Sequence, residues 1–149
     1  MNKFSGEDNR RKYFRIDLDT PLCTEMTIVE VKGKKIKTSI TNVCVIDIGA
    51  GGLAFTSKLN FPIGKEVIFR FNTTIFKESI SFIGNIIRRT EIRDGIYKYG
   101  VQFILDEQTE TEYIKIFNRL LIALKKDWRN IEYSSCKGSK CRNVENASV

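Results

Sequence analysis

The feature that most constrains the fold is a series of short strand-like segments between Pro21 and Leu105, with no helical spacing among them. The clearest of them alternates, because Val67, Phe69 and Phe71 point one way and their neighbours the other. We predict strands rich in β-branched and aromatic residues, separated by turn signals, at about residues 22–31, 35–48, 53–56, 66–71, 79–89 and 97–105. Six short strands without helices between them predict a mainly β protein, a small six-stranded antiparallel β-barrel.

The last patterned segment is a C-terminal α-helix, which we expect to close one mouth of the barrel. Thr109-x-x-Glu112 has the form of a capping box at its start. Apolar residues then recur at helical spacing: Tyr113, Ile116, Phe117, Leu120, Leu121 and Leu124. We therefore expect a disordered N-terminus at 1–9, one folded domain at 10–128 and a polar mobile tail at 129–149.

A glycine-rich break, Asp47-Ile48-Gly49-Ala50-Gly51-Gly52, interrupts the β pattern. It is not a dinucleotide-binding fingerprint, because the glycine spacing differs and a strand rather than a helix follows. One interpretation is a glycine bulge in a bent barrel strand. The other is a ligand site, since glycines let a ligand approach the backbone and Asp47 can accept hydrogen bonds from a guanine or hold an arginine.

A basic arm, Arg11-Lys12-Tyr13-Phe14-Arg15, precedes the first strand, and Arg10 adds a third guanidinium. Guanidinium groups present a planar fork of donors that suits phosphate oxygens and the guanine edge. The net charge of +7 likewise favours an anionic partner. A solvated basic terminus is the alternative that the arm alone leaves open.

The lack of histidine, the spacing of the cysteines and the lack of a long apolar run argue against catalysis, metal binding and membrane insertion, respectively. The chain has no histidine, which removes the commonest general base and metal ligand. Its four cysteines lack the spacing of a zinc framework, so we expect reduced, isolated thiols. With neither a secretory signal nor an apolar run near the ~20 residues that cross a bilayer, we expect a cytoplasmic protein.

Taken together, the arm and the glycine break resemble the PilZ family of bacterial cyclic di-GMP receptors. That family pairs an RxxxR arm with a [D/N]xSxxG strand turn, on a six-stranded barrel that ends in a helix. Arg11 and Arg15 fit the first motif, and Asp47 and Gly52 fit the second, with Gly49 in the serine position. The resemblance extends through segments 84–88 and 99–103 and covers about residues 10–125.

The resemblance implies a receptor that binds cyclic di-GMP, has no other cofactor, orders its arginine arm on the ligand and signals to an unidentified protein partner. It implies that the ligand is held by Arg10, Arg11, Arg15, Asp47, Gly49, Gly51 and Gly52. No catalytic or metal-binding residue is expected.

Two further functions remain open from the sequence. One is a ligand-free PilZ-type adaptor that acts through protein–protein contacts. The other, which we expect less, is a small-barrel nucleic-acid-binding protein, which would need several nucleotides and show a steep salt dependence. An enzyme fits worst, because no nucleophile–base pair can be assembled without histidine.

Overall fold

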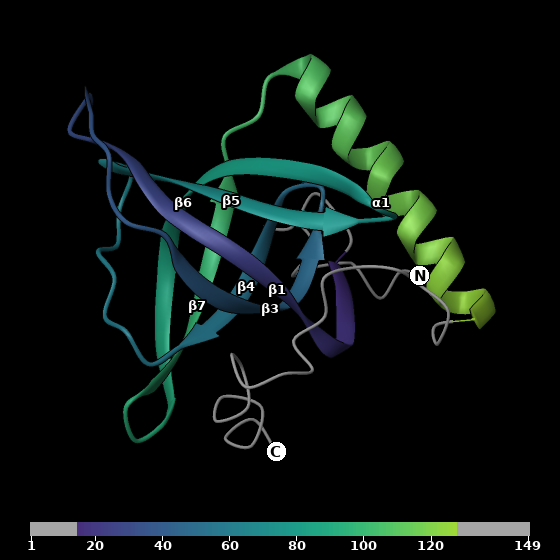
Figure 1. The fold of residues 1–149 in the computed structure, drawn as a ribbon, viewed down its shortest axis with the longest axis horizontal. Coiled ribbons are helices and arrows are strands. Elements are labelled where there is room, and N and C mark those ends of the chain that lie inside the picture. Colours follow the sequence, from purple (N-terminus) through teal and green to yellow (C-terminus); the bar gives the residue numbers. More distant parts are fainter. Residues whose placement is uncertain (1–14, 128–149) are drawn as a thin grey trace, which may run out of the picture.

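The computed structural model describes residues 15–127, which form a closed antiparallel barrel with one helix (Figure 1). The elements are β1 Arg15–Val31, β2 Lys34–Lys35, β3 Thr41–Gly49, β4 Gly52–Ser57, β5 Val67–Ile75, β6 Glu78–Arg93, β7 Ile96–Phe103 and α1 Glu107–Asp127. The strand order is β2-β1-β3-β4-β7-β6-β5, and β1 also pairs with β5. This second pairing closes six strands into a barrel, so the predicted fold class is confirmed.

The interior of the barrel is filled by aromatic side chains from facing strands. The largest fully buried side chains include Phe55, Phe69, Phe71, Phe82 and Tyr99. The rings of Phe55 and Tyr99, a cross-strand pair on β4 and β7, stack with centroids 4.9 Å apart. Burial of such rings is a large contribution to the stability of a domain of this size, and the alternation predicted for β5 is confirmed.

The helix α1 begins earlier than its predicted capping box. Asp106 precedes the helix, and its Oδ1 accepts a hydrogen bond from the backbone N–H of Thr109 at 2.8 Å. Bonds from the N–H and hydroxyl of Thr109 stabilise the ionised carboxylate and lower the pKa of Asp106 below its ordinary value. The N-terminal cap is therefore Asp106, and the prediction that Thr109 plays this role is wrong.

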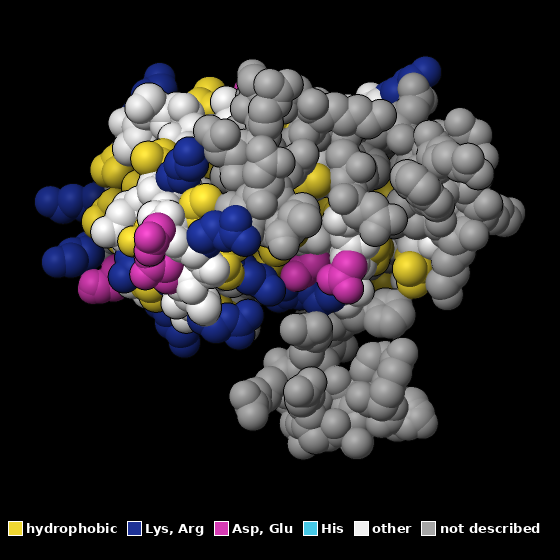
Figure 2. Space-filling view, turned by 90° about the horizontal axis from the view of Figure 1, so that it is seen from below, with side chains coloured by type: hydrophobic (Ala, Val, Ile, Leu, Met, Phe, Trp, Pro, Cys, Tyr) yellow, Lys and Arg dark blue, Asp and Glu magenta, His cyan; other side chains and the backbone are white. Residues whose placement is uncertain are grey.

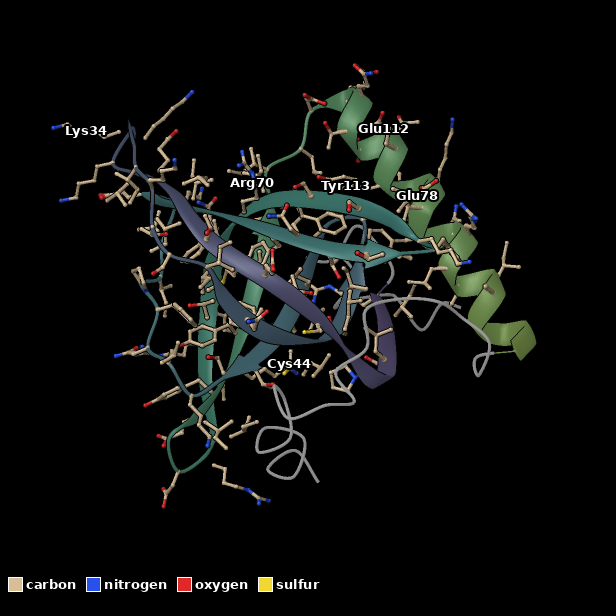
Figure 3. The ribbon with its side chains drawn as sticks, viewed as in Figure 1. Lys34, Cys44, Arg70, Glu78, Glu112 and Tyr113 are labelled. Atoms are coloured by element: carbon tan, nitrogen blue, oxygen red, sulfur yellow. The ribbon has the colours of Figure 1, made fainter. Side chains whose placement is uncertain are left out.

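The helix packs its apolar side on the barrel. Tyr113, Phe117 and Leu120 are buried, and the rings of Tyr113 and Phe117 lie against Phe82. Tyr113 points from α1 toward β5 and β6 (Figure 3), and its hydroxyl donates to the carbonyl of Ser81 at 3.0 Å. Burial raises the pKa of Tyr113 above its ordinary value. The helix thus closes the barrel, as predicted.

The first strand begins at Arg15, well before the predicted start at Leu22. The pairing of β1 with β3 shifts register between Asp17 and Leu22, and this irregular stretch contains Pro21. Proline has no N–H to donate to a neighbouring strand, so it is tolerated at such a bulge. Ile16 and Leu18 alternate with Asp17 and Asp19 just before Pro21, and the pattern analysis overlooked this short alternation.

The predicted strand 35–48 is in fact two strands. Lys35 belongs to β2, which pairs with the end of β1 through a turn in which Lys32 and Gly33 both have left-handed φ. The chain then runs beside β1, where the N–H of Ile36 donates to the carbonyl of Val29. Regular pairing with β1 resumes at Thr41 in β3.

Several expectations concern thiols, metals, membranes and termini. Cys23 is a free thiol, whereas Cys44 is disulfide-bonded, so the prediction of isolated thiols is wrong for Cys44. Between residues 15 and 127 no group of His, Cys, Asp and Glu could hold a metal ion. No helix within that same stretch is long and apolar enough to cross a membrane. The predicted disordered segment 1–9 and tail 129–149 lie outside the described residues.

Candidate functional site

The two sequence motifs meet where β1 and β3 lie side by side. Arg15, the first residue of β1, pairs in register with Gly49, the last residue of β3, and Asp17 pairs with Asp47. The guanidinium Nη1 of Arg15 donates to Oδ1 of Asp47 at 2.6 Å. Both side chains are mostly shielded, with 18% and 16% of their surface exposed. This charge-assisted hydrogen bond holds the guanidinium of Arg15 beside the carboxylate of Asp47.

Gly52, the first residue of β4, lies beneath the same guanidinium. A Cβ on Gly52 would come within 2.0 Å of the carbonyl oxygen of Val101 on β7 and within 3.2 Å of Nη2 of Arg15. No side chain can be accommodated against backbone at that distance. Glycine is therefore required at position 52, and it lets Arg15 lie close to the strands.

Gly49 and Gly51, the other glycines of the break, do not have left-handed φ angles. Within the described part of the chain, left-handed φ among glycines occurs at Gly33, Gly64 and Gly95, and Gly49 is a strand residue of β3. Gly51 lies in the bend between β3 and β4, and its carbonyl accepts a hydrogen bond from the N–H of Phe103 at 2.9 Å. The break is therefore a tight β3–β4 connection attached to the end of β7.

Two of the predicted ligand-binding residues, Arg10 and Arg11, lie outside the described residues. The structure thus brings together Arg15, Asp47 and the glycines 49, 51 and 52. The roles proposed for the arm remain predictions.

The strand register identifies a further cation that the sequence analysis did not select. Asp47 pairs with Ala54, Ala54 with Gly100, and Gly100 with Arg88, in one row across β3, β4, β7 and β6. The guanidinium of Arg88 lies over Gly100, with Nη2 3.2 Å from the position of a Cβ there. Directly opposed residues share one face of a sheet, so Arg88 and Asp47 border the same surface. Only the register, and no motif of the sequence, reveals this relation.

One cavity of the described residues lies away from this surface. It has a volume of about 530 Å³ and is lined by residues of β5, β6 and the start of α1, among them Arg70, Ser81 and Tyr113. Figure 2 shows a face on which Lys and Arg side chains gather around hydrophobic ones.

Comparison with known proteins identifies the family. The PilZ domain family model matches residues 9–122, while no curated protein matches the chain. Among solved structures, the inhibitor of motility MotI (DgrA) of Bacillus subtilis is similar with a TM-score of 0.55 and 16% identity, covering 76% of this chain and 52% of that one.

YcgR from Escherichia coli, solved in complex with c-di-GMP, is similar with a TM-score of 0.50 and 16% identity, covering 80% of this chain and 48% of that one. The PilZ domain of CeSA from a cellulose-synthesizing bacterium gives 0.49 and 21%, covering 75% and 98%. This chain spans about half the length of the MotI and YcgR chains. At these identities the structural similarities show the fold alone. The family model, by contrast, matches most of the sequence, and the chain belongs to the PilZ domain family.

Proposed function

We propose that this protein is a receptor for cyclic di-GMP that catalyses no reaction. The observation that supports this most is the 2.6 Å contact between Arg15 and Asp47, because it joins the two motifs by which the family binds its ligand. Membership of the PilZ domain family supports the same function, as does the similarity to YcgR, whose structure contains this ligand.

The charges at the site suggest why the arginines that precede Arg15 are needed to bind cyclic di-GMP. Asp17 and Asp47 offset the positive charges of Arg15 and Arg88, so these four side chains carry no net charge together. Cyclic di-GMP brings two phosphates, whose charge must be neutralised by other cations. Arg10, Arg11 and Lys12 are the nearest cations in sequence to Arg15, and the guanidinium forks of the two arginines suit phosphate oxygens.

Each group has a distinct task in the proposed complex. Arg15, which donates to Asp47 through Nη1, directs its remaining N–H groups to a phosphate or a guanine edge. The carboxylate of Asp47 accepts hydrogen bonds from guanine N–H groups, and Gly49, Gly51 and Gly52 allow close approach. Arg10 and Arg11 close over the ligand from outside, and the ordered arm presents a new surface to a protein partner.

Titration calorimetry of the full chain with cyclic di-GMP at about 0.15 M salt tests this function. Saturable binding is expected, and the ligand should be recovered chemically unchanged after long incubation. A linear di-guanylate and a longer single-stranded oligonucleotide serve as controls. Tighter binding of the oligonucleotide, with a steep salt dependence, would instead identify a nucleic-acid-binding barrel.

A second candidate is a ligand-free adaptor, which two features favour. Gly49 occupies the position of the motif serine, and Arg15 is already paired with Asp47. Absence of binding at millimolar cyclic di-GMP, in a protein that melts cooperatively, would support the adaptor and contradict the receptor.

A further inference from the structure

The guanidinium of Arg88 lies flat on the outside of the barrel. Its Nη2, Cζ and Nε atoms are 3.2, 3.5 and 3.5 Å from the position that a Cβ on Gly100 would occupy. Three such similar distances mean that the guanidinium turns one face to the strand. Its other face points away from the barrel, and Gly100 makes this possible because it has no side chain.

Arg88 also has no partner of its own among the described residues. Its neighbour Arg89 differs, since Arg89 bonds to the side-chain oxygen of Asn60 and lies over the ring of Tyr97, 5.4 Å from its centroid. Both arginines are exposed. A guanidinium held flat without an ion pair keeps its stacking face available.

The position of Arg88 relates it to the proposed ligand site. Gly100 pairs with Ala54, and Gly52 pairs with Gln102, so Gly52 and Gly100 are diagonal neighbours on one face of β4 and β7. Such neighbours lie about 7–8 Å apart. The guanidinium of Arg15 covers Gly52 and that of Arg88 covers Gly100, so two guanidinium groups lie side by side above small residues.

We propose that Arg88 is a further ligand-contacting residue, which stacks the outward face of its guanidinium on a guanine base of cyclic di-GMP. Arginine stacks well on flat aromatic rings, because its charge is delocalised over a weakly hydrated plane. Asp47 reads the hydrogen-bonding edge of guanine, while Arg88 supplies a stacking surface beside it. This inference rests on the proposed function and adds a residue that lies outside both motifs.

Calorimetric titration of the full chain with cyclic di-GMP, comparing Arg88→Ala, Arg88→Lys and Arg89→Ala, tests the proposal. Arg88→Ala should weaken binding about 5- to 150-fold, the range for loss of one stacked base. Arg88→Lys should lose nearly as much, because it keeps the charge and loses the plane. Arg89→Ala removes the same charge one residue away and should weaken binding less than Arg88→Ala by at least about fivefold. Melting temperatures should stay close to that of the wild type, since both side chains are exposed.

The possible results separate this inference from the function on which it rests. A wild type that fails to bind refutes the receptor, and the role of Arg88 with it. A wild type that binds, with equal losses in Arg88→Ala and Arg89→Ala, overturns the role of Arg88 alone. Wild-type affinity in Arg88→Lys would show that only charge matters and would overturn the stacking.

Discussion

Asp17 lies directly opposite Asp47 in the pairing of β1 with β3, and Asp47 contacts the guanidinium of Arg15. Directly opposed like charges on a sheet cost roughly 0.2–1 kcal/mol. Asp17 is exposed, whereas Asp47 is held by Arg15. The barrel therefore keeps, beside its candidate site, a negative charge that an anionic ligand must overcome.

Asp17→Asn should for this reason tighten the binding of cyclic di-GMP by up to about fivefold. The gain should shrink as salt is raised, because exposed charges are screened. Calorimetric titrations at two salt concentrations measure both effects. Asp94→Asn, at the exposed turn between β6 and β7, is the control of equal charge. Equal gains in the two variants would mean that only net charge matters.

Arg15→Ala should weaken ligand binding by about 1–3 kcal/mol, the range for a lost bidentate guanidinium contact. It should also lower the free energy of unfolding by about 1–3 kcal/mol, between the values for exposed and buried ion pairs. A double-mutant cycle with Asp47→Ala, measured by urea unfolding without ligand, isolates the pair. A coupling energy of zero would contradict the structural role given to the pair. We expect Arg11→Ala to weaken binding similarly and to leave stability unchanged.

Gly49→Ser restores the hydroxyl that the family motif has at this position. Because Gly49 is a strand residue and not left-handed, serine should not strain the backbone. A hydrogen bond contributes about 0.5–1.5 kcal/mol net, or about 1.5–3 to a charged group, so affinity should rise several-fold to roughly a hundredfold. Affinity and melting temperature are measured together. Weaker binding at an unchanged melting temperature would show that glycine is there for close approach.

Gly52→Ala and Gly100→Ala are the same substitution on neighbouring strands, with opposite expected results. At Gly52 the methyl would meet the Val101 carbonyl oxygen at 2.0 Å, and such overpacking costs about 1–3 kcal/mol or more. At Gly100 it would meet only the movable end of Arg88, so urea unfolding should change little. Ligand affinity in Gly100→Ala should nevertheless fall, because Arg88 is displaced. Equal stability losses would show that the two sites are equally crowded.

Asp106→Ala should lower the melting temperature at neutral pH, because the cap of α1 is lost. The pKa of Asp106 is lowered in the folded protein from its ordinary value of 3.8. Its stabilising effect is therefore fully present above pH 3.8 and is lost as the pH falls through the lower folded value. The difference in melting temperature between wild type and Asp106→Ala should shrink as the pH falls below 3.8. A constant difference across that range would contradict an ionised cap.

The sequence predicted best what depends on local pattern. Alternation placed Phe69 and Phe71 in the core, and helical spacing placed Tyr113 and Phe117 against the barrel, because burial follows directly from side-chain period. The start of β1 was missed although Ile16 and Leu18 alternate with Asp17 and Asp19, because this alternation is short and Pro21 interrupts it before Leu22.

Some residues of the candidate site could likewise be named from the sequence, whereas other relations within it appear only in the structure. Arg15 and Asp47 could be named from the sequence, since each belongs to a recognisable motif. The requirement for glycine at Gly52 comes from a carbonyl on β7, and the relation of Arg88 to Gly100 comes from the register of β6 and β7. Contacts between distant strands have no local pattern, so no inspection of the sequence could supply them.

The strand β1 connects the Arg15–Asp47 site to the pairing of β1 with β5, where the barrel closes. One continuous strand carries Arg15 at its start, pairs with β3, and ends at Val31 in its pairing with β5. A pull on Arg15 must be absorbed at the register shift between Asp17 and Leu22 or passed along the backbone to the β1–β5 seam. Any displacement of Arg15 therefore acts on the same strand whose pairing with β5 closes the barrel.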